Sequence, residues 1–343
     1  MNGRFECSIR VSNDAYIHSR SATHWSHAYE QLVPGRFHGT HAEAWLGPLQ
    51  FGYERVDGAF KYSGRAWPGA RIFVSFLPGS GDVFYDGRQI EKGAVLTRRC
   101  ESVDRVTCNS RAEMLFVTVD ESYIERFAAR LSGRTLFGKD DGQPVIFSKD
   151  KVVVAEFERT ILHTLRGISA NRQILDDERA RQAMQESMLG SLYDALLAQP
   201  SESARLHCSS TRARIVDRAI GFIEAKLADP LSTASIAAVV RVPPRTLRTD
   251  FKQVIGITPA QYIRSMRLNR VRRELAAGRC CSIESAAVRW GFWHTGRFAN
   301  YYREAFGEYP SATVRAASKT RGLGPSQPSL ASLGEVCSYS EYV

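Results

Sequence analysis

The sequence predicts an α+β protein whose first half is rich in strands and whose C-terminal third is all α-helical. Residues 1 to about 150 alternate short apolar runs with Gly and Pro, which is typical of strands bounded by turns. From about residue 151 apolar residues recur at i, i+4, the spacing of helices. A third observation is one pattern of small and apolar residues that occurs twice between Leu231 and Pro310. We expect an N-terminal domain at 1–200, a linker at 201–211, a helical domain at 212–319 and a disordered tail at 320–343.

The strand-forming runs of the first half include ARIFVSFLPGSGDVFYDG and AEMLFVTVD. Strands this short, separated by turns, predict a small cupin-like β-barrel or sandwich. Two helical stripes follow, one of Val154, Phe157, Ile161 and Leu165, the other of Met184, Met188, Leu192 and Leu196. We interpret the second stripe as core packing, with the seam of a homodimer as the alternative.

Composition distinguishes the linker and the tail. Residues 199–211 read QPSESARLHCSST, a polar and Ser-rich segment, and the run RGLGPSQPSLASLGEV after Lys319 is low in apolar residues. The N-terminus lacks a signal-peptide pattern, and no stretch approaches the ~20 apolar residues of a membrane span. The seven cysteines include no C-x-x-C pair. These features favour a cytoplasmic protein without membrane contact.

Positive charge is concentrated in the helical third. The net charge is +10, and residues 212–319 contain 19 Lys/Arg against 8 Asp/Glu, whereas residues 1–211 contain 26 of each sign. Basic residues that neutralise phosphates release counterions, so this excess favours binding to a nucleic-acid backbone. A basic surface without a partner is the alternative.

The repeated pattern has the spacing of a helix-turn-helix. Its first copy consists of Ala237, Val242, Leu247 and Phe251. Its second copy, with one extra residue in the turn, consists of Ala287, Phe292, Phe298 and Tyr302. A helix-turn-helix requires a small residue where its helices cross, an apolar residue in the turn and an i, i+4 pair that anchors the second helix. Both copies meet all three requirements.

Local signals place the helices of the first copy. A leading apolar stripe over 215–227 ends before Pro230, and Ser232 caps a short helix that reaches about Val240. Pro244 begins the recognition helix, because the first position of a helix needs no N–H.

The polar residues beside each anchoring pair form the predicted DNA-contacting surface. Arg can bind guanine O6 and N7 bidentately, and Asn can bind adenine in the same way. Lys252 is expected at a phosphate and His294 at a phosphate or as a helix cap, while Trp293 is interpreted as a packing residue rather than a base stacker. For each exposed Arg the alternative is a phosphate contact or a solvated charge. The predicted DNA-contacting residues are Arg245, Thr246, Arg248, Thr249, Lys252, His294, Thr295, Arg297, Asn300 and Arg303.

Residues 259–277 form one predicted helix between the two copies. Its 19 residues span ~28 Å, so two recognition helices could enter successive major grooves, about 34 Å apart on one DNA face. Its inward residues are predicted to be Tyr262, Ile263, Met266, Val271 and Leu275. Its arginines cannot all face DNA, so several are expected to be structural or solvated: Arg264, Arg267, Arg270, Arg272 and Arg273.

Residues 231–315 resemble the DNA-binding domain of the AraC/XylS family of transcription regulators, on the motifs ITPAQYIRSMRLNRVRREL and WGFWHTGRFANYYREAFGEYPSATVR. The resemblance implies a sequence-specific regulator, an activator, whose partners are promoter DNA and RNA polymerase. It places base-contacting positions at Arg245, Arg248, Thr249, Gly296, Arg297 and Asn300. Gly296 has no side chain with which to read a base. Pro243 departs from the Ser-like helix cap that is common in the family.

The runs EQLVPGRFHGTHAEAWLG and RAWPGARIFVSFLP resemble the N-terminal domain of the ethanolamine-operon regulator subgroup of that family, over residues 24–125. The resemblance implies a regulatory domain that senses a small-molecule effector, with ethanolamine and cobalamin as the precedent. It identifies no effector-contacting residue, and it implies no resident cofactor.

Two other functions compete with this prediction. One is a constitutive DNA-binding regulator whose N-terminal domain only dimerises. The other is a metalloenzyme fused to a DNA-binding domain, since His24 and His27, and His38 and His41 with Glu43 nearby, have spacings that metal ligands can have. H-x-x-H on turns is a weak signal, and the H-x-H pattern of metal-binding cupins is absent. We therefore expect neither a metal site nor catalysis.

Overall fold

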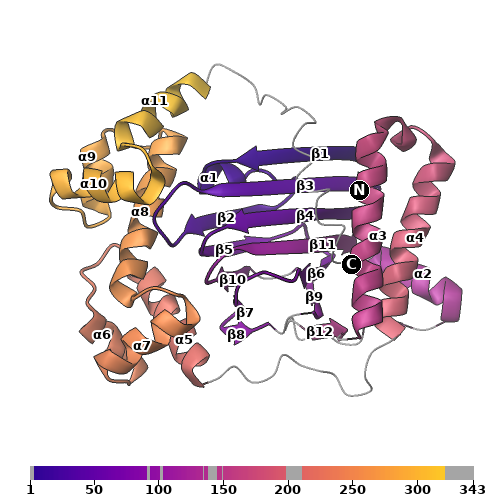
Figure 1. Ribbon diagram of the computed structural model, residues 1–343, viewed down its shortest axis with the longest axis horizontal. Coiled ribbons are helices and arrows are strands. Elements are labelled where there is room, and N and C mark those ends of the chain that lie inside the picture. The colour runs from indigo at the N-terminus through magenta and orange to yellow at the C-terminus, as the bar shows by residue number, and fades with distance from the viewer. Residues whose placement is uncertain are drawn as a thin grey trace.

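The computed structural model describes residues 4–90, 93–100, 103–133, 135–137, 145–148, 150–197 and 211–320. The predicted linker at 201–211 and tail at 320–343 lie outside these residues, apart from Thr211 and Thr320, which belong to helices. Figure 1 shows three parts side by side: a pair of β-sheets in the middle, a helical layer on one side and the helices of the C-terminal third on the other.

The N-terminal half folds into two antiparallel sheets. The larger has the strand order β1-β3-β4-β11-β6-β9-β12 and the smaller has the order β2-β5-β10-β7-β8. Among the described strands the two sheets have open ends, so they form a sandwich rather than a closed barrel. The strands are β1 (Phe5–Ser12), β2 (Ser26–Gln31), β3 (His38–Leu46), β4 (Leu49–Asp57), β5 (Phe60–Arg65), β6 (Ala70–Phe76), β7 (Val83–Tyr85), β8 (Arg88–Gln89), β9 (Val95–Arg99), β10 (Asp104–Cys108), β11 (Ala112–Asp120) and β12 (Val145–Ser148).

Residue alternation along the central strand β11 separates two apolar cores. Leu115 and Val117 belong to the core shared with the helical layer, whereas Met114 and Phe116 belong to the core between the sheets. Side chains in a strand point alternately to opposite faces, and a stretch of consecutive apolar residues such as Met114–Val117 suits a strand buried on both sides. The run AEMLFVTVD therefore occupies the middle of the larger sheet.

The helical layer covers the outer face of the larger sheet. It consists of α2 (Glu121–Ser132), α3 (Lys151–Ala170), a 3-10 turn (Arg172–Leu175) and α4 (Glu178–Leu197), while the short α1 (Ala15–His18) precedes β2. Phe157 and Ile161 of α3 and Leu192 of α4 are fully buried in the same core as Phe51 and Leu115. The α4 stripe thus contributes to core packing, as predicted.

The C-terminal third is entirely helical in its described residues. It comprises α5 (Thr211–Ala225), α6 (Thr233–Val240), α7 (Pro244–Val254), α8 (Pro259–Ala277), α9 (Ile283–Arg289), α10 (Thr295–Phe306) and α11 (Pro310–Thr320). Ser232 caps α6 through reciprocal hydrogen bonds with Ser235, and Ser282 caps α9 with Ser285 in the same way. The Ser232 cap was predicted, whereas α11 was not.

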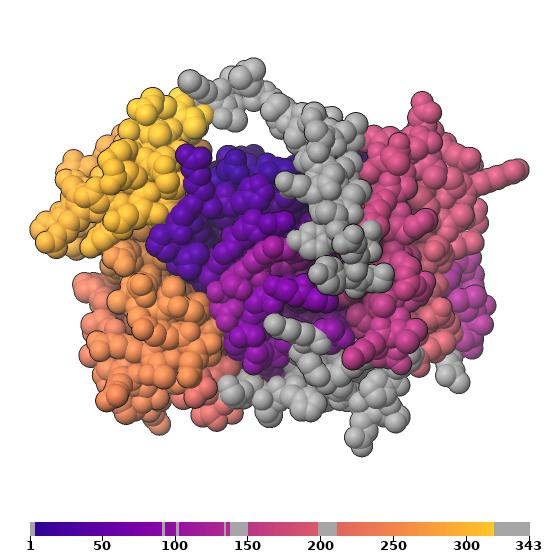
Figure 2. All heavy atoms as spheres, in the orientation of Figure 1, coloured from indigo at the N-terminus to yellow at the C-terminus, as the bar shows by residue number. Residues whose placement is uncertain are grey.

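The helices of the C-terminal third pack directly against the sandwich. Leu32, Ala59 and Phe84 of the N-terminal half belong to the apolar cluster that α5, α6, α7 and α8 enclose. In Figure 2 the orange and yellow atoms of the helices lie against the indigo atoms of the first strands. The sandwich and the helices therefore share an apolar core, and a strand of the sandwich can contact the helix-turn-helix units directly.

Candidate nucleic-acid interface and ligand pocket

Helix α7 presents its five predicted DNA-contacting side chains to solvent. It begins at Pro244, directly after Pro243, whose side chain makes no capping hydrogen bond. Leu247 and Phe251 have no exposed surface and fix the inner face of the helix. The exposed residues are Arg245, Thr246, Arg248, Thr249 and Lys252.

The outer face of α7 carries uncompensated positive charge. Asp250, the acidic residue of this helix, is turned inward and accepts a hydrogen bond from Arg212 Nε at 2.9 Å. Thr249 Oγ1 donates to the backbone oxygen of Arg245 at 3.2 Å, so its hydroxyl is already used within the helix. Arg248 and Lys252 remain available for bases and phosphates.

Helix α10 repeats this arrangement with one difference. Phe298 and Tyr302 are buried, and Thr295, Arg297 and Asn300 are exposed. Arg303, also exposed, donates to Tyr309 Oη at 2.8 Å and lies over the ring of that tyrosine. The Arg303 guanidinium therefore already makes a contact within the protein.

One prediction at the turn before α10 is wrong. Trp293 is 73% exposed, so it is not a packing residue. The backbone N–H of Phe292 closes the turn by donating to Ala287 O at 3.0 Å, and its ring packs on Phe298, so the single apolar position of the turn is already filled. His294 occupies the N-cap position of α10 without a side-chain capping bond, which leaves a phosphate contact as its predicted role.

The arginine side chains of α8 make contacts within the protein. Arg264 stacks on Tyr301, and Arg267 donates to the backbone oxygens of Leu227 and Asp229. The other three, Arg270, Arg272 and Arg273, pair with acidic side chains. The predicted inward residues, Tyr262, Ile263, Met266, Val271 and Leu275, are all buried. Helix α8 is thus anchored along its length as a spacer between the two units.

Strand β2, at one edge of the smaller sheet, is a main contact between the sandwich and the helices. Asn269 of α8 accepts a bond from Gln31 N at 3.1 Å and donates to Gln31 O at 2.8 Å. The Gln31 side chain donates to Ala305 O in α10 at 2.9 Å. The buried carboxylate of Glu30 accepts a bond from Arg273 at 3.2 Å. One strand therefore holds both the spacer and the second recognition helix.

Other bonds extend this contact to the first unit. Lys61 of β5 lies 2.6 Å from Glu224 of α5 and 3.4 Å from Glu30. Asp14, the N-cap residue of α1, pairs with Arg272, which also contacts Glu308 at 3.2 Å. Because these partners are buried or half-buried, the sandwich restrains both helix-turn-helix units together.

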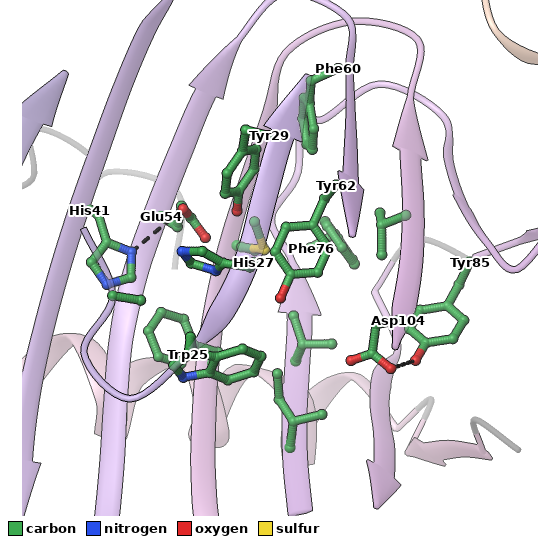
Figure 3. A pocket seen from close by; sticks show the side chains of 16 residues that line it. Trp25, His27, Tyr29, His41, Glu54, Phe60, Tyr62, Phe76, Tyr85 and Asp104 are labelled. Carbon is green, nitrogen blue, oxygen red and sulfur yellow. Dashed lines mark hydrogen bonds and ion pairs between the residues drawn. The ribbon is translucent and has the colours of Figure 1, made fainter. Parts of the chain in front are cut away.

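A pocket lies between the two sheets (Figure 3). The apolar part of its wall consists of Trp25, Phe60, Ile72, Val74, Phe76, Val106, Met114 and Phe116. Its polar groups come from His27 and Tyr29 on β2, Glu54 on β4, Tyr62 on β5 and Asp104 on β10. His27 Nε2 is buried and has no hydrogen-bond partner among the described residues. Burial lowers the pKa of His27 to about 4, so its imidazole is neutral at pH 7.

The acidic groups of the pocket are paired within the protein. Glu54 lies 2.8 Å from His18 Nε2 and 3.5 Å from His41 Nδ1. Burial opposes ionisation of Glu54, but hydrogen bonds with the two histidines hold its pKa well below the ordinary value. Burial raises the pKa of Asp104 to about 6 although Arg98 opposes the shift, and Asp104 accepts hydrogen bonds from Tyr85 and Arg98.

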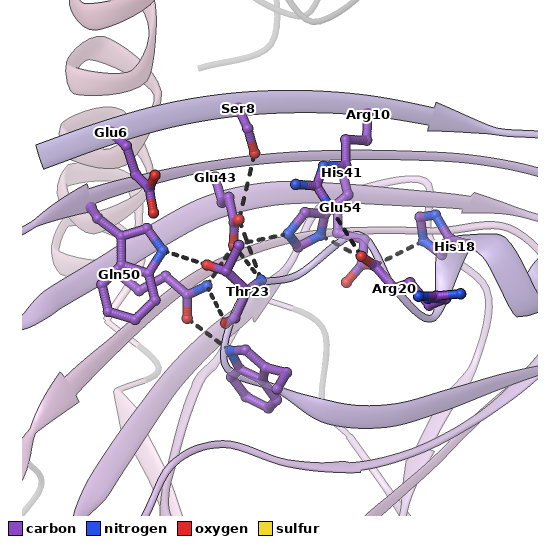
Figure 4. A network of polar contacts seen from close by, with 12 residues as sticks. Glu6, Ser8, Arg10, His18, Arg20, Thr23, His41, Glu43, Gln50 and Glu54 are labelled. Atoms are coloured by element: carbon purple, nitrogen blue, oxygen red, sulfur yellow. Dashed lines mark hydrogen bonds and ion pairs between the residues drawn. The ribbon is translucent and has the colours of Figure 1, made fainter. Parts of the chain in front are cut away.

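His41 belongs to a polar network that continues beyond the pocket (Figure 4). It lies 3.4 Å from Glu43, which also accepts bonds from Gln50 Nε2 at 2.6 Å and Thr23 N at 3.2 Å. Burial lowers the pKa of His41, but hydrogen bonds to Glu43 and Glu54 outweigh burial and raise it to about 9. His41 is therefore a buried cation at neutral pH.

The histidines considered as metal ligands have different surroundings. His24 packs edge-on against Trp45, His38 contacts Asn13, His27 faces the pocket and His41 pairs with the two glutamates. Within the described residues no group of three or more His, Cys, Asp or Glu side chains is arranged to hold a metal ion. None of the described helices combines the length and apolar character that a membrane span requires.

Comparison with known proteins gives a family match within the helical third. Residues 236–316 match the family model described as "Helix-turn-helix domain". The chain is 34% identical over 146 residues to the "XylDLEGF operon transcriptional activator 3" of Pseudomonas putida, a match that covers 42% of this chain and 44% of that relative. It is 37% identical over 119 residues to the "XylDLEGF operon transcriptional activator 2" of the same organism, covering 34% of this chain and 75% of the relative.

Among solved structures, an AraC-type transcriptional regulator from Chromobacterium violaceum is 32% identical, with a TM-score of 0.29, and the match covers 31% of this chain and 93% of that one. The chain spans less than half the length of the first of these relatives.

Proposed function

The chain belongs to the AraC/XylS family of transcription regulators, and from this premise we propose that it is a sequence-specific DNA-binding regulator, an activator, under the control of a small-molecule effector. The observation that carries the proposal is the pair of exposed recognition surfaces on α7 and α10, each backed by a buried aromatic anchor and joined by the rigid spacer α8.

In this proposal Arg245, Arg248, Arg297 and Asn300 read base edges in two major-groove segments. Arg and Asn can each bind a purine bidentately, and the side chains of Arg248 and Arg297 are both exposed, with no hydrogen bond or ion pair to another of the described residues. Lys252, His294 and Arg303 contact phosphates, while Thr246, Thr249 and Thr295 lie beside them on the exposed faces. The exposed Trp293 joins this surface next to the start of α10.

Effector control is supported by the position of the pocket. Strand β2 contributes His27 and Tyr29 to the pocket, and two residues later Gln31 binds α8 and α10. A ligand that favours one position of β2 would change the arrangement of the recognition helices, which a switch requires. A sandwich that only dimerised would need no such pocket, so this observation favours effector control over constitutive binding.

Further parts of the proposal rest on the sequence. The resemblance supports membership of the ethanolamine-operon subgroup and RNA polymerase as a partner. Composition and periodicity support a cupin-like sandwich, action in the cytoplasm, formation of a homodimer and the division of the chain at 200, 211 and 319. The relatives are operon activators by name, which supports a non-enzymatic role.

Footprinting on fragments recovered by genome-wide binding tests the proposal. We expect protection of two major-groove segments on one DNA face, about one helical turn apart. Protection of a single segment, or no binding to any duplex at low ionic strength, would contradict it. The matched control is the variant Arg248→Ala with Arg297→Ala, which should lose specific protection at both segments while its melting temperature stays unchanged.

A further inference from the structure

We propose that the pocket between the sheets binds a small, uncharged aromatic molecule that carries one hydroxyl or carbonyl group. The inference rests on the proposed function in that it identifies the chemistry of the effector. It is carried by three features of the pocket: an aromatic wall, two neutral polar atoms without a hydrogen-bond partner among the described residues (His27 Nε2 and Tyr29 Oη), and charges of both signs that are already paired.

The wall favours a flat apolar ring. Aromatic side chains approach the cavity from both sheets and from the loop before β2, among them Trp25, Tyr29, Tyr62 and Phe116. Figure 3 shows Trp25 and Tyr62 next to His27, and the rings of both residues contact its imidazole. Aromatic groups prefer offset or edge-to-face contacts with other rings, which such a wall provides in several directions. The cavity is about 70 Å³, smaller than the ~150 Å³ of a cavity known to hold benzene, so a single ring is the upper limit of ligand size and a fused system or a sugar is excluded.

The unpartnered polar atoms, His27 Nε2 and Tyr29 Oη, both belong to β2 and define where the ligand's polar group lies. His27 Nε2 is buried at the wall of the cavity with no described partner, and a buried polar atom of this kind is costly unless something bonds to it. A neutral imidazole can accept from a hydroxyl or donate to a carbonyl. One hydroxyl or carbonyl on the ring would satisfy His27.

The paired charges disfavour ionised ligands of either sign. A carboxylate in the cavity would face Glu54 and Asp104, and an ammonium would face the protonated His41 and the Arg98 guanidinium beside Asp104. Since the protein's own partners already neutralise these groups, a ligand charge would be buried without compensation. The structure therefore selects against benzoate-like anions and against amines.

A size-matched series tests the inference with the full-length protein. Titration calorimetry would compare benzyl alcohol, benzaldehyde, benzoate and benzylamine, which share one ring and differ in charge, with ethanolamine as a fifth ligand. We expect the neutral pair to bind at least ten times more tightly than any charged member. Tighter binding of benzoate, benzylamine or ethanolamine would overturn the proposed ligand class. Absence of binding by all five, in protein that still binds its DNA, would overturn the site.

Two variants locate the binding. His27→Phe removes one of the two polar atoms and should weaken benzyl alcohol binding about tenfold, and Val74→Phe should fill the cavity and abolish binding of the neutral pair. His38→Phe, on β3 of the larger sheet and outside the pocket, is the control for a histidine-to-phenylalanine change and should leave the affinity unchanged. Thermal melting of each variant without ligand verifies folding. Neutral ligands whose binding neither pocket variant alters would overturn the assignment.

A parallel measurement separates this inference from the proposed function. The affinity for the target DNA would be measured with and without benzyl alcohol. Pocket binding without a change in DNA affinity would support the ligand class and contradict effector control, whereas a change that His27→Phe removes would support both.

Discussion

The N-terminal sandwich and the C-terminal helices hold their charges in opposite ways. In the sandwich, Glu43, Glu54, His41 and Asp104 are buried and paired with one another or with neighbours of opposite sign. In the helices, the charged residues of the recognition faces are exposed to solvent, where a molecule outside the protein can bind them. Buried pairs couple stability to pH, whereas exposed charges respond to salt and to polyanions. The first region is suited to sensing and the second to binding, and four predictions test this division.

The largest effect is expected from removing a buried charge in the sandwich. Glu54→Gln leaves the protonated His41 with one partner fewer, and breaking a buried pair in this way costs about 3–5 kcal/mol. The free energy of unfolding, from urea titrations, should fall accordingly. The control Glu6→Gln alters a half-exposed pair with Arg4 and should stay within about 0.5 kcal/mol. If Glu54→Gln cost no more than Glu6→Gln, the sandwich would not depend on its internal charges.

The stability of the sandwich should have a maximum near pH 6.5. The pKa of His41 is raised to about 9 in the folded state, so its contribution is complete below the unfolded value of 6.5 and is lost as pH rises through 9. The pKa of His27 is lowered to about 4, so the unfolded chain binds more protons at this site between pH 4 and 6.5, and this contribution is lost as pH falls through that range. Asp104, whose pKa is raised from 3.8 to about 6, has the opposite effect between those two values, so the acid limb should be shallower than the alkaline limb.

Urea unfolding followed by tryptophan fluorescence from pH 4 to 10 measures this profile. On the alkaline side the free energy of unfolding should drop by about 2–3 kcal/mol, since one pKa unit corresponds to about 1.4 kcal/mol. His41→Gln should flatten the alkaline limb and leave the acid limb. A profile that is level from pH 6.5 to 9 would show that His41 is not held as a cation.

On the helical side, Arg248→Ala should weaken specific DNA binding by about 1–3 kcal/mol and relax the preference at one base position, without loss of stability. Competition binding against a library of single-base variants measures both effects. Arg159→Ala, an exposed arginine of α3 paired with Glu156, is the control and should leave DNA affinity unchanged. Weakening that is the same for every sequence would make Arg248 a phosphate contact.

The smallest expected effect is a difference between α7 and α10 in how their residues affect the salt dependence of DNA binding. Lys252→Ala should reduce the slope of log affinity against log salt by about 1. Arg303→Ala should reduce it by less, because Tyr309 already holds that guanidinium. Affinities measured between 50 and 300 mM salt give the slopes, and equal reductions would mean that the Tyr309 contact breaks on DNA binding.

Much of the proposed DNA-binding surface could be predicted from the sequence because its signals are local. The predicted spacer helix at 259–277 has the bounds of α8, and Pro244 begins α7 as expected. Leu247, Phe251, Phe298 and Tyr302 are buried, which leaves the predicted polar residues on the outer faces. Spacing of three or four residues and the conformation of proline act within one helical turn, so they are visible in the chain itself.

The exposure and the contacts of other residues could not be predicted from local signals. Trp293 is exposed because Phe292 occupies the apolar position of the turn and packs on Phe298. The same turn leaves the side chain of His294 without a capping hydrogen bond to α10. The periodicity of α8 could not show which of its arginines are structural, because their partners Glu30 and Asp14 lie more than 200 positions away in the sequence. The histidine spacing likewise gave no sign that His27 would face a cavity while His38 would not.

The sequence by itself determined the class of fold, the duplicated motif and the inward and outward faces of each recognition helix, since these follow from the backbone periodicity of single elements. Only the tertiary structure decided that strand β2 lies between a pocket and the spacer helix, and that the pocket's acidic groups are neutralised from within. Those features arise where distant segments pack together, and burial then fixes both the pairing of the side chains and their protonation.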